Sequence, residues 1–197
     1  GVYQTFRHNG TAKGYAGTGN HLYTGGSSDD FGLAGGASAD IVFATANAER
    51  LRIHNNGSVV VGHTTSLLTH ATHNFQLQVI GTNFPTSGIS QQRFENGNSG
   101  ASLTLAHSRG AKGVYTALIN GDEYGKIRFY GSDGTDFQGY GAAIIAKVDG
   151  NVGVNSTPGR LELATTEGGS NGSTTRIRIG SDGKVRLGGS ANQAAAY

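Results

Sequence analysis

The chain has 197 residues, among them 34 glycines, two prolines and no cysteine, and it carries a formal net charge of +2. This composition excludes disulfides and thiol nucleophiles and a collagen repeat. Its Lys and Arg residues are scattered singly, which argues against a nucleic-acid partner.

No apolar run approaches the roughly 18 residues of a membrane-spanning helix, so no membrane insertion is expected. Leu, Ile, Val and Phe together make up about a fifth of the chain, near the level at which strongly charged chains stay unfolded. This chain is weakly charged and clearly patterned, so we expect it to fold. Its apolar side chains are nevertheless too few for a large separate core, and we expect burial by association into an oligomer.

Residues 1–66 are predicted to be the end of a first β-module. A glycine-rich, turn-forming stretch leads into a predicted strand, IVFAT, at Ile41–Thr45. The segment RLRIHNNGSVVVG then runs from Arg50 to Gly62, and apolar residues alternate with polar ones along its first half. This period of two is typical of a half-buried strand, and the interrupting NNG indicates a hairpin.

The pattern of this segment also selects the length of the hairpin loop. A three-residue loop that ends with Gly57 in the left-handed conformation places Ile53 opposite Val59 and Leu51 opposite Val61. A two-residue loop would mix apolar and polar side chains on each face, so the longer loop is predicted. Val60 then points to the outer face, where we expect it to contact another chain.

Residues 67–74 are interpreted as a connector, and residues 75–190 as a complete second module. Strands are predicted within NFQLQVIG (74–81), ASLTLAHS (101–108), VYTALIN (114–120), GKIRFYGSDG (125–134), AAIIAKVDGNVGV (142–154) and GRLELATT (159–166). LELAT corresponds to IVFAT of the first module, with extra residues, Gly168 to Gly172 among them, before the hairpin that follows. Residues 191–197 are left as a C-terminal tail.

The second module closes with the same thirteen-residue pattern as the first, RIRIGSDGKVRLG at 176–188. The same reasoning places Ile179 opposite Val185 and Ile177 opposite Leu187, with Gly183 in the left-handed position. No segment shows convincing helical periodicity. The fold class predicted is all-β, with elongated glycine-rich modules that each contact mainly their neighbours.

The acidic residues mostly stand beside glycine in turn-forming strings, where Asp is expected for backbone reasons. Asp133 and Asp136 in GSDGTD are candidate calcium ligands, but such a site needs six or more oxygens. His70 and His73 are candidate metal ligands in the connector, although connector histidines are usually solvated. We predict no metal site, no cofactor and no catalytic residue, and hence a protein that is not an enzyme.

A glycan-binding site is the sharper functional hypothesis. Sugar rings stack on exposed aromatic side chains while their hydroxyl groups need fixed polar partners. The predicted ligand-binding residues are Tyr130, Asp133, Asp136 and Tyr140. Phe137 and Gln138 lie between them in the sequence. A second string comprises Tyr3, Phe6, Tyr15, His21 and Tyr23. The alternative for every ring is that it packs as core between chains.

Two stretches resemble a known family. AERLRIHNNGSVVVGHTTS is similar to the ERMRI…SSGNVGIGTTS segment of bacteriophage tail fibres, tailspikes and neck appendages. The stretch from GKIRFYGSDG to RIRIGSDGKVRLG is similar to the module that precedes the C-terminal chaperone in many such fibres. The departures are His54-Asn55-Asn56 in place of Asp-Ser-Ser and His63 in place of the first Thr, all turn or surface positions.

The resemblance implies a homotrimer in which β-strands of three chains wind around one axis, as in a triple β-helix. It implies a virion protein that is extracellular and contacts a glycan or protein on the host surface. In this family an intramolecular chaperone often follows and cleaves itself off, which would make Tyr197 a new C-terminus. Two alternatives stay open: a stalk or glycan-binding module of a polysaccharide-degrading tailspike, and a secreted bacterial adhesin.

Overall fold

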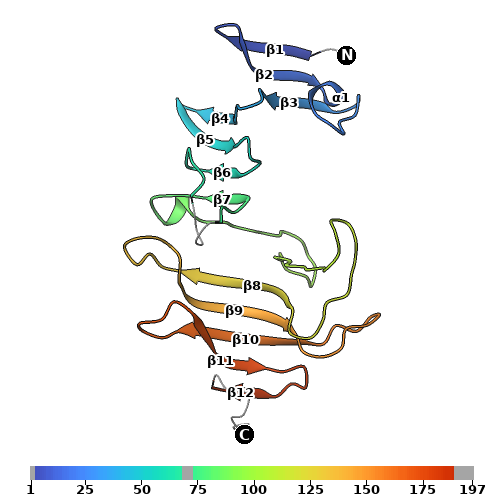
Figure 1. The fold of residues 1–197 in the computed structure, drawn as a ribbon, viewed down its shortest axis with the longest axis vertical. Coiled ribbons are helices and arrows are strands. Elements are labelled where there is room, and N and C mark those ends of the chain that lie inside the picture. Colours follow the sequence, from blue (N-terminus) through green and yellow to red (C-terminus); the bar gives the residue numbers. More distant parts are fainter. Residues whose placement is uncertain (1–2, 68–72, 189–197) are drawn as a thin grey trace. The chain divides into compact units, whose positions relative to one another are not determined.

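The computed structural model describes residues 3–67 and 73–188, and their regular secondary structure is almost entirely β-strand (Figure 1). The exceptions are one short helix, α1 (Gly19–Leu22), and one 3-10 turn, η1 (Phe84–Thr86). No helix in the described ranges has the length and hydropathy to cross a bilayer. Internal contacts divide the chain into a first unit, residues 1–90, and a second unit, residues 91–197.

The first unit contains two sheets. The first is antiparallel, with strand order β1 (Tyr3–His8), β2 (Thr11–Thr18), β3 (Phe31–Gly35). The second has the order β4 (Ile41–Thr45), β5 (Ala48–Ile53), β6 (Val59–Val61), β7 (Leu77–Val79). β7 runs parallel to β6, so the strand that the sequence assigned to the second module joins the sheet of the first hairpin.

The first predicted hairpin is confirmed, with its register. Leu51 pairs with Val61 and Ile53 with Val59, and Gly57 has a φ of +89°. The His54 amide donates to the Ser58 carbonyl at 2.8 Å, which closes the three-residue loop. The loop length predicted from the alternation of faces is therefore the one observed.

The expectation for Val60 was wrong. Its side chain is fully buried within the chain. Val60 lies beside Gln78 of β7, whose side-chain amide donates to the Ser66 hydroxyl and to the Leu67 carbonyl at 2.9 and 3.0 Å. These bonds hold the start of the connector on the Val60 face, so this face is covered without a second chain.

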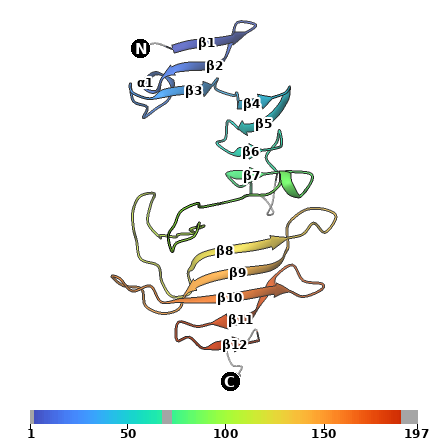
Figure 2. The ribbon, with the colours of Figure 1, turned by 180° about the vertical axis from the view of Figure 1, so that it is seen from behind.

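The second unit is built on one antiparallel sheet with strand order β12-β11-β10-β9-β8 (Figure 2). The strands are β8 (Glu123–Tyr130), β9 (Tyr140–Val148), β10 (Gly159–Thr166), β11 (Ser173–Ile179) and β12 (Val185–Leu187). β11 and β12 form the second predicted hairpin, with Ile177 opposite Leu187 and Ile179 opposite Val185. Gly183 has a φ of +77°, which confirms the loop as well.

The two hairpins share a β-bulge that the sequence did not reveal. The pairing of β4 with β5 shifts after Phe43, and the pairing of β10 with β11 shifts after Leu163. The unpaired residues are Arg50 and Arg176, each of which donates its Nε–H to a threonine hydroxyl of the neighbouring strand at 3.0 Å. The repeated thirteen residues thus reproduce one local geometry, bulge included.

Two other predicted strands are absent. Residues 101–108 and 114–120 have irregular backbone, and several of their apolar side chains, including Leu103 and Ile119, are exposed. Their alternating pattern favours a strand, but a strand also needs a hydrogen-bonded neighbour. No neighbour is paired with these segments among the described residues. The predicted tail, 191–197, and its end Tyr197 lie outside the described residues.

The five-stranded sheet has two unlike faces. On one face a row of apolar residues crosses the strands in register: Ile127, Ile144, Leu163, Ile177 and Leu187. We call this the apolar face, and most of its large side chains are exposed. The other, the charged face, carries Lys126, Ile145, Glu162, Arg178 and Arg186 in one row across the strands. Ile145 also belongs to a small core with Ala143 and Ala164.

Candidate functional site

A groove of about 400 Å³ lies at one end of the five-stranded sheet. It is bounded by two loops, residues 131–139 between β8 and β9 and residues 167–172 between β10 and β11. Its lining residues are Gly131, Ser132, Asp133, Gln138, Gly139, Tyr140, Gly141, Thr166, Ser170 and Asn171. Most of the polar groups among them are uncharged hydroxyls and amides, with one carboxylate.

The β8–β9 loop is shaped by its own aspartates. The Asp133 carboxylate accepts the backbone N–H groups of Thr135 and Asp136 at 2.8 and 3.1 Å, and these bonds lower the pKa of that carboxyl. Asp136 accepts the N–H of Gln138 at 2.7 Å. Both aspartates therefore perform the turn role expected from GSDGTD. Asp133 also lines the groove, whereas Asp136 is not among the lining residues.

The two predicted tyrosines lie in contact at the strand ends beside this groove. Tyr130 pairs with Tyr140 across β8 and β9, and their rings meet edge to face with centroids 5.7 Å apart. The Tyr140 hydroxyl accepts a hydrogen bond from Ser173 at 3.1 Å, and its ring packs against the small core. Core packing and ligand contact were alternatives for each ring in the sequence analysis. Tyr140 does both kinds of work in part, because it packs on the core and also lines the groove.

The groove's second wall consists of residues that the sequence analysis did not select. Thr166, Ser170 and Asn171 come from the end of β10 and the loop after it. A signal for this wall was present, because the connection between β10 and β11 is longer than its counterpart in the first unit, where Ala46 and Asn47 alone join β4 to β5. What the sequence could not show is that this loop lies beside the GSDGTD loop.

The second aromatic string is placed in the first unit, around β1, β2 and α1. Tyr3 and Tyr15 meet edge to face at 5.7 Å. The Tyr23 hydroxyl donates to Asp30 at 3.1 Å, a bond that raises the pKa of Tyr23. Phe6 is half exposed, and His21 contacts the side chain of Asn20. These rings do not converge on a shared cavity in the part of the chain that the structure describes.

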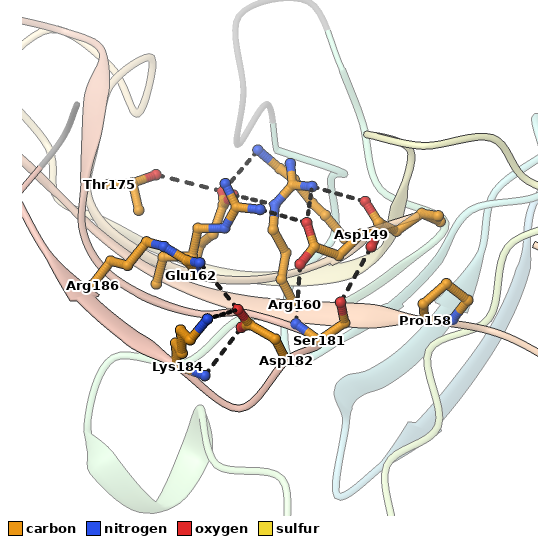
Figure 3. Close-up of polar contacts among 12 residues, drawn as sticks. Asp149, Pro158, Arg160, Glu162, Thr175, Ser181, Asp182, Lys184 and Arg186 are labelled. Atoms are coloured by element: carbon orange, nitrogen blue, oxygen red, sulfur yellow. Dashed lines mark hydrogen bonds and ion pairs between the residues drawn. The ribbon is translucent and has the colours of Figure 1, made fainter. Parts of the chain in front are cut away.

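A lattice of ion pairs covers the charged face (Figure 3). Glu162 is only 5% exposed and accepts hydrogen bonds from Arg160 at 2.6 Å and Lys147 at 2.8 Å. Burial alone would raise the pKa of Glu162, but these two cations outweigh it and the pKa is lowered. The carboxylate therefore stays charged and holds β9 and β10 together.

Asp149 connects the same lattice to the second hairpin. Its carboxylate accepts the Ser181 N–H at 3.0 Å and is paired with Arg160 and Arg178. The Ser181 bond and the cations lower the pKa of Asp149. In the first unit Asp40 occupies the equivalent position, accepting the Asn55 N–H at 2.9 Å.

A second cavity, of about 450 Å³, lies at the opposite end of the same sheet. Its lining is mainly apolar and comes from residues 107–108 and 115–118, Tyr124 and the β9–β10 loop. Tyr115 and Val154, both among the lining residues, are almost fully exposed. Within residues 3–67 and 73–188, no cluster of three His, Asp or Glu side chains has the arrangement of a metal site.

No family model and no curated protein sequence matches the chain. Among solved structures, it is similar to the carboxy-terminal domain of the bacteriophage T5 L-shaped tail fibre, with a TM-score of 0.62 and 16% sequence identity. The match covers 98% of this chain and 84% of that one. The chain therefore has the fold of a bacteriophage tail-fibre carboxy-terminal domain.

Proposed function

We propose that this chain is a structural, receptor-binding segment of a phage tail fibre, exposed on the virion, that adheres to a glycan or protein on the host surface. The observation that carries the proposal is the tail-fibre fold, which extends over 98% of the chain. The sequence resemblance of the two hairpin regions to phage fibres supports the same function independently of the fold comparison.

The apolar face supports a homotrimer as the working form. Isolated large apolar side chains on a surface are ordinary, but a contiguous patch in a soluble protein marks an interaction site. Here the patch is an ordered row on every strand of the sheet, and its members Ile127, Leu163 and Leu187 are 43%, 38% and 50% exposed. Three copies that turn these faces toward a common axis would bury them.

The irregular segments 101–108 and 114–120 support pairing between chains. Leu103 and Leu105 alternate with polar residues, and the Leu105 side chain lies over Gly125 at the edge of the apolar face. A segment of this pattern becomes a strand when another chain supplies the hydrogen-bonding partner. Strands exchanged between copies are the expected origin of an intertwined fibre.

The groove beside Tyr140 is proposed as the receptor contact. It combines one carboxylate, several amide and hydroxyl groups and an aromatic ring, which is the mixture that sugar hydroxyls and C–H faces require. A trimer would present three such grooves, and linked sites raise avidity by roughly 10² to 10⁴ over one contact. Each groove can therefore be weak on its own.

Adsorption of the purified protein to host cells tests this function. Asn171→Ala and Gln138→Ala remove groove side chains from the two opposite walls and should each reduce adsorption, while exposed Asn151→Ala, in the β9–β10 loop, should not. Tyr140→Ala is a poor probe because its ring packs on the core, so Tyr140→Phe is used instead. Normal adsorption by all groove variants would place the receptor contact elsewhere.

A second assay, with purified host polysaccharide in place of cells, separates binding from degradation. Purified host polysaccharide that is retained at its original length supports adhesion. Polysaccharide that is shortened would instead favour the tailspike alternative. A self-cleaving chaperone is a further part of the proposal, and it rests on the family resemblance. It is tested by mass spectrometry of the product of the full gene, which should be shorter than the encoded chain.

A further inference from the structure

Arg128 differs from every other cationic side chain of the chain in its surroundings. All fifteen Lys and Arg residues lie in the described ranges, and nine of them form ion pairs there. Among these ranges the unpaired cations are Arg7, Lys13, Arg50, Lys112, Arg128 and Arg176. Five of the six are exposed to solvent, whereas Arg128 is half-buried.

The contacts of Arg128 are with aromatic side chains. Its Nη1 donates to the Tyr130 hydroxyl at 3.2 Å, and its Cζ lies 4.9 Å from the centroid of the Tyr140 ring. Its Nε is buried and has no hydrogen-bond acceptor among the described residues. Stacking on a ring offsets part of the cost of removing a guanidinium from water, but an unsatisfied buried N–H adds to that cost.

The carboxylates on this side of the sheet are already engaged by other cations. They are Glu123 with Lys126, Glu162 with Lys147 and Arg160, Asp149 with Arg160 and Arg178, and Asp182 with Lys184 and Arg186. Figure 3 shows Asp149, Glu162 and Asp182 in these contacts. Within residues 3–67 and 73–188, Arg128 therefore has no acidic partner, and it lies beside the hydroxyl groups of Tyr130, Tyr140 and Ser173.

We propose that Arg128 and these hydroxyls form a subsite for an anionic substituent, a phosphate or a carboxylate, of the host-surface glycan. A guanidinium matches the geometry of both groups and binds them through charge-assisted hydrogen bonds. Tyr140 links this subsite to the groove, because Arg128 covers its ring and Tyr140 itself lines the groove. The subsite rests on the proposed receptor function and specifies the chemistry of the ligand.

The position of the charges also orients the ligand. Asp133 lines the groove as the single carboxylate, and its lowered pKa keeps it ionised near neutral pH. An acidic sugar would be repelled there and attracted toward Arg128, whereas neutral hydroxyl groups can donate to Asp133. The ligand is therefore an acidic or phosphorylated glycan whose neutral part lies against the loops.

Small probes test the subsite directly by calorimetric titration of the purified protein. Glucose 6-phosphate and glucuronate should bind, the first reporting a phosphate and the second a carboxylate, while glucose should bind more weakly. Arg128→Met should weaken binding of the charged probes by roughly tenfold or more, since a hydrogen bond to a charged group is lost. Exposed Arg176→Met is the matched control and should leave binding unchanged.

Arg128→Lys keeps the positive charge but loses the planar guanidinium with its paired N–H donors. If Arg128→Met does not fold, this variant tests whether the guanidinium binds the anion. Partial loss of binding by the lysine variant, with an unchanged melting temperature, supports recognition by the guanidinium. Equal binding of glucose and the charged probes, or wild-type affinity in both Arg128 variants, would overturn the subsite.

Different experimental outcomes would show that the subsite is wrong and that the receptor function is wrong. Host polysaccharide from which phosphate and carboxylate groups have been removed should lose retention by the wild-type protein. If it is retained fully and Asn171→Ala still abolishes retention, the subsite is wrong and the groove function stands. If the charged probes bind through Arg128 but no host polysaccharide is retained, the subsite stands and the receptor function is wrong.

Discussion

Gly57 and Gly183 lie 126 positions apart and occupy the same place in two copies of one hairpin, with φ angles of +89° and +77°. Side chains strongly disfavour this region of backbone space, and β-branched ones most of all. A Cβ added at Gly183 would meet no atom within 4 Å, and one added at Gly57 would only touch Gln76 at 3.6 Å. Any penalty at these sites therefore comes from the backbone.

Gly183→Val is expected to lower the free energy of unfolding by about 1–3 kcal/mol, the usual range for a strained residue. Lys184→Val, at the next position, loses only an exposed ion pair with Asp182 and should cost about 1 kcal/mol at most. Urea denaturation of both variants measures the difference. Similar losses at the two positions would show that the left-handed conformation is unimportant.

Glu162→Gln should be costly because it leaves two half-buried cations, Lys147 and Arg160, without their shared carboxylate. Removing one partner of a buried ion pair commonly costs about 3–5 kcal/mol. Asp182→Asn breaks only exposed pairs, with Lys184 and Arg186, and is expected to have a much smaller effect. Thermal unfolding compares the two, and an equal effect would contradict the assignment of Glu162 as the centre of the lattice.

Leu163→Asp should prevent assembly because the residue lies at the middle of the row on the apolar face. A charge buried without a partner at the trimer axis is strongly unfavourable, whereas a single chain leaves this position partly in water. Light scattering should therefore report monomers for this variant and trimers for the wild type. Lys112→Asp, an exposed loop change of greater charge, should remain trimeric, and a monomeric wild type would refute the arrangement.

Acid should destabilise the protein through aspartates such as Asp122. Its carboxylate accepts hydrogen bonds from Arg109 at 2.6 and 2.9 Å and from the Ile119 N–H, and these contacts lower its pKa well below the ordinary 3.8. The folded state then binds fewer protons than the unfolded state near this pH, so stability falls as pH falls. The loss should begin at about pH 5 and continue below 3.8.

Melting temperatures measured between pH 7 and pH 2 test this linkage. Asp122→Asn should be less stable than the wild type at pH 7 and should approach it at pH 2, because protonation of the carboxyl in the unfolded state then removes most of the stabilisation that the folded-state contacts give. Asp29→Asn, an exposed loop change, should follow the wild-type curve throughout. A constant gap between wild type and Asp122→Asn at every pH would exclude the carboxylate charge as the cause.

Hairpins were predictable from the sequence because their register depends on residues only a few positions apart. Ile53 and Val59 are brought together by a local turn, and their alternation alone selects the loop. The strands expected at 101–108 and 114–120 failed for the opposite reason: a strand depends on a partner that local pattern cannot supply. Val60 was placed wrongly because the coverage of its face depends on Gln78 and the connector, at a longer separation.

The residues of the candidate site also differ in whether a local sequence pattern could identify them. Asp133 and Tyr140 were found because turn chemistry and aromatic strings are visible in one segment. Asn171 and Ser170 were missed, since they reach the groove only through the order of β8, β9 and β10 in the sheet. The role of Arg128 was also invisible, because its lack of an acidic partner follows from where the carboxylates of other strands lie.

Because Val60 is fully buried, the first hairpin sequence can replace the second, but the second cannot replace the first. Grafting residues 50–62 into the place of 176–188 would set Val60 at the position of half-buried Arg186, where a valine is tolerable. The reverse graft would set Arg186 at a fully buried site, where a charge is not. A repeat protein that grows by duplicating its modules could therefore reuse the first hairpin at either position. The second hairpin fits only where the position of Arg186 is exposed to solvent.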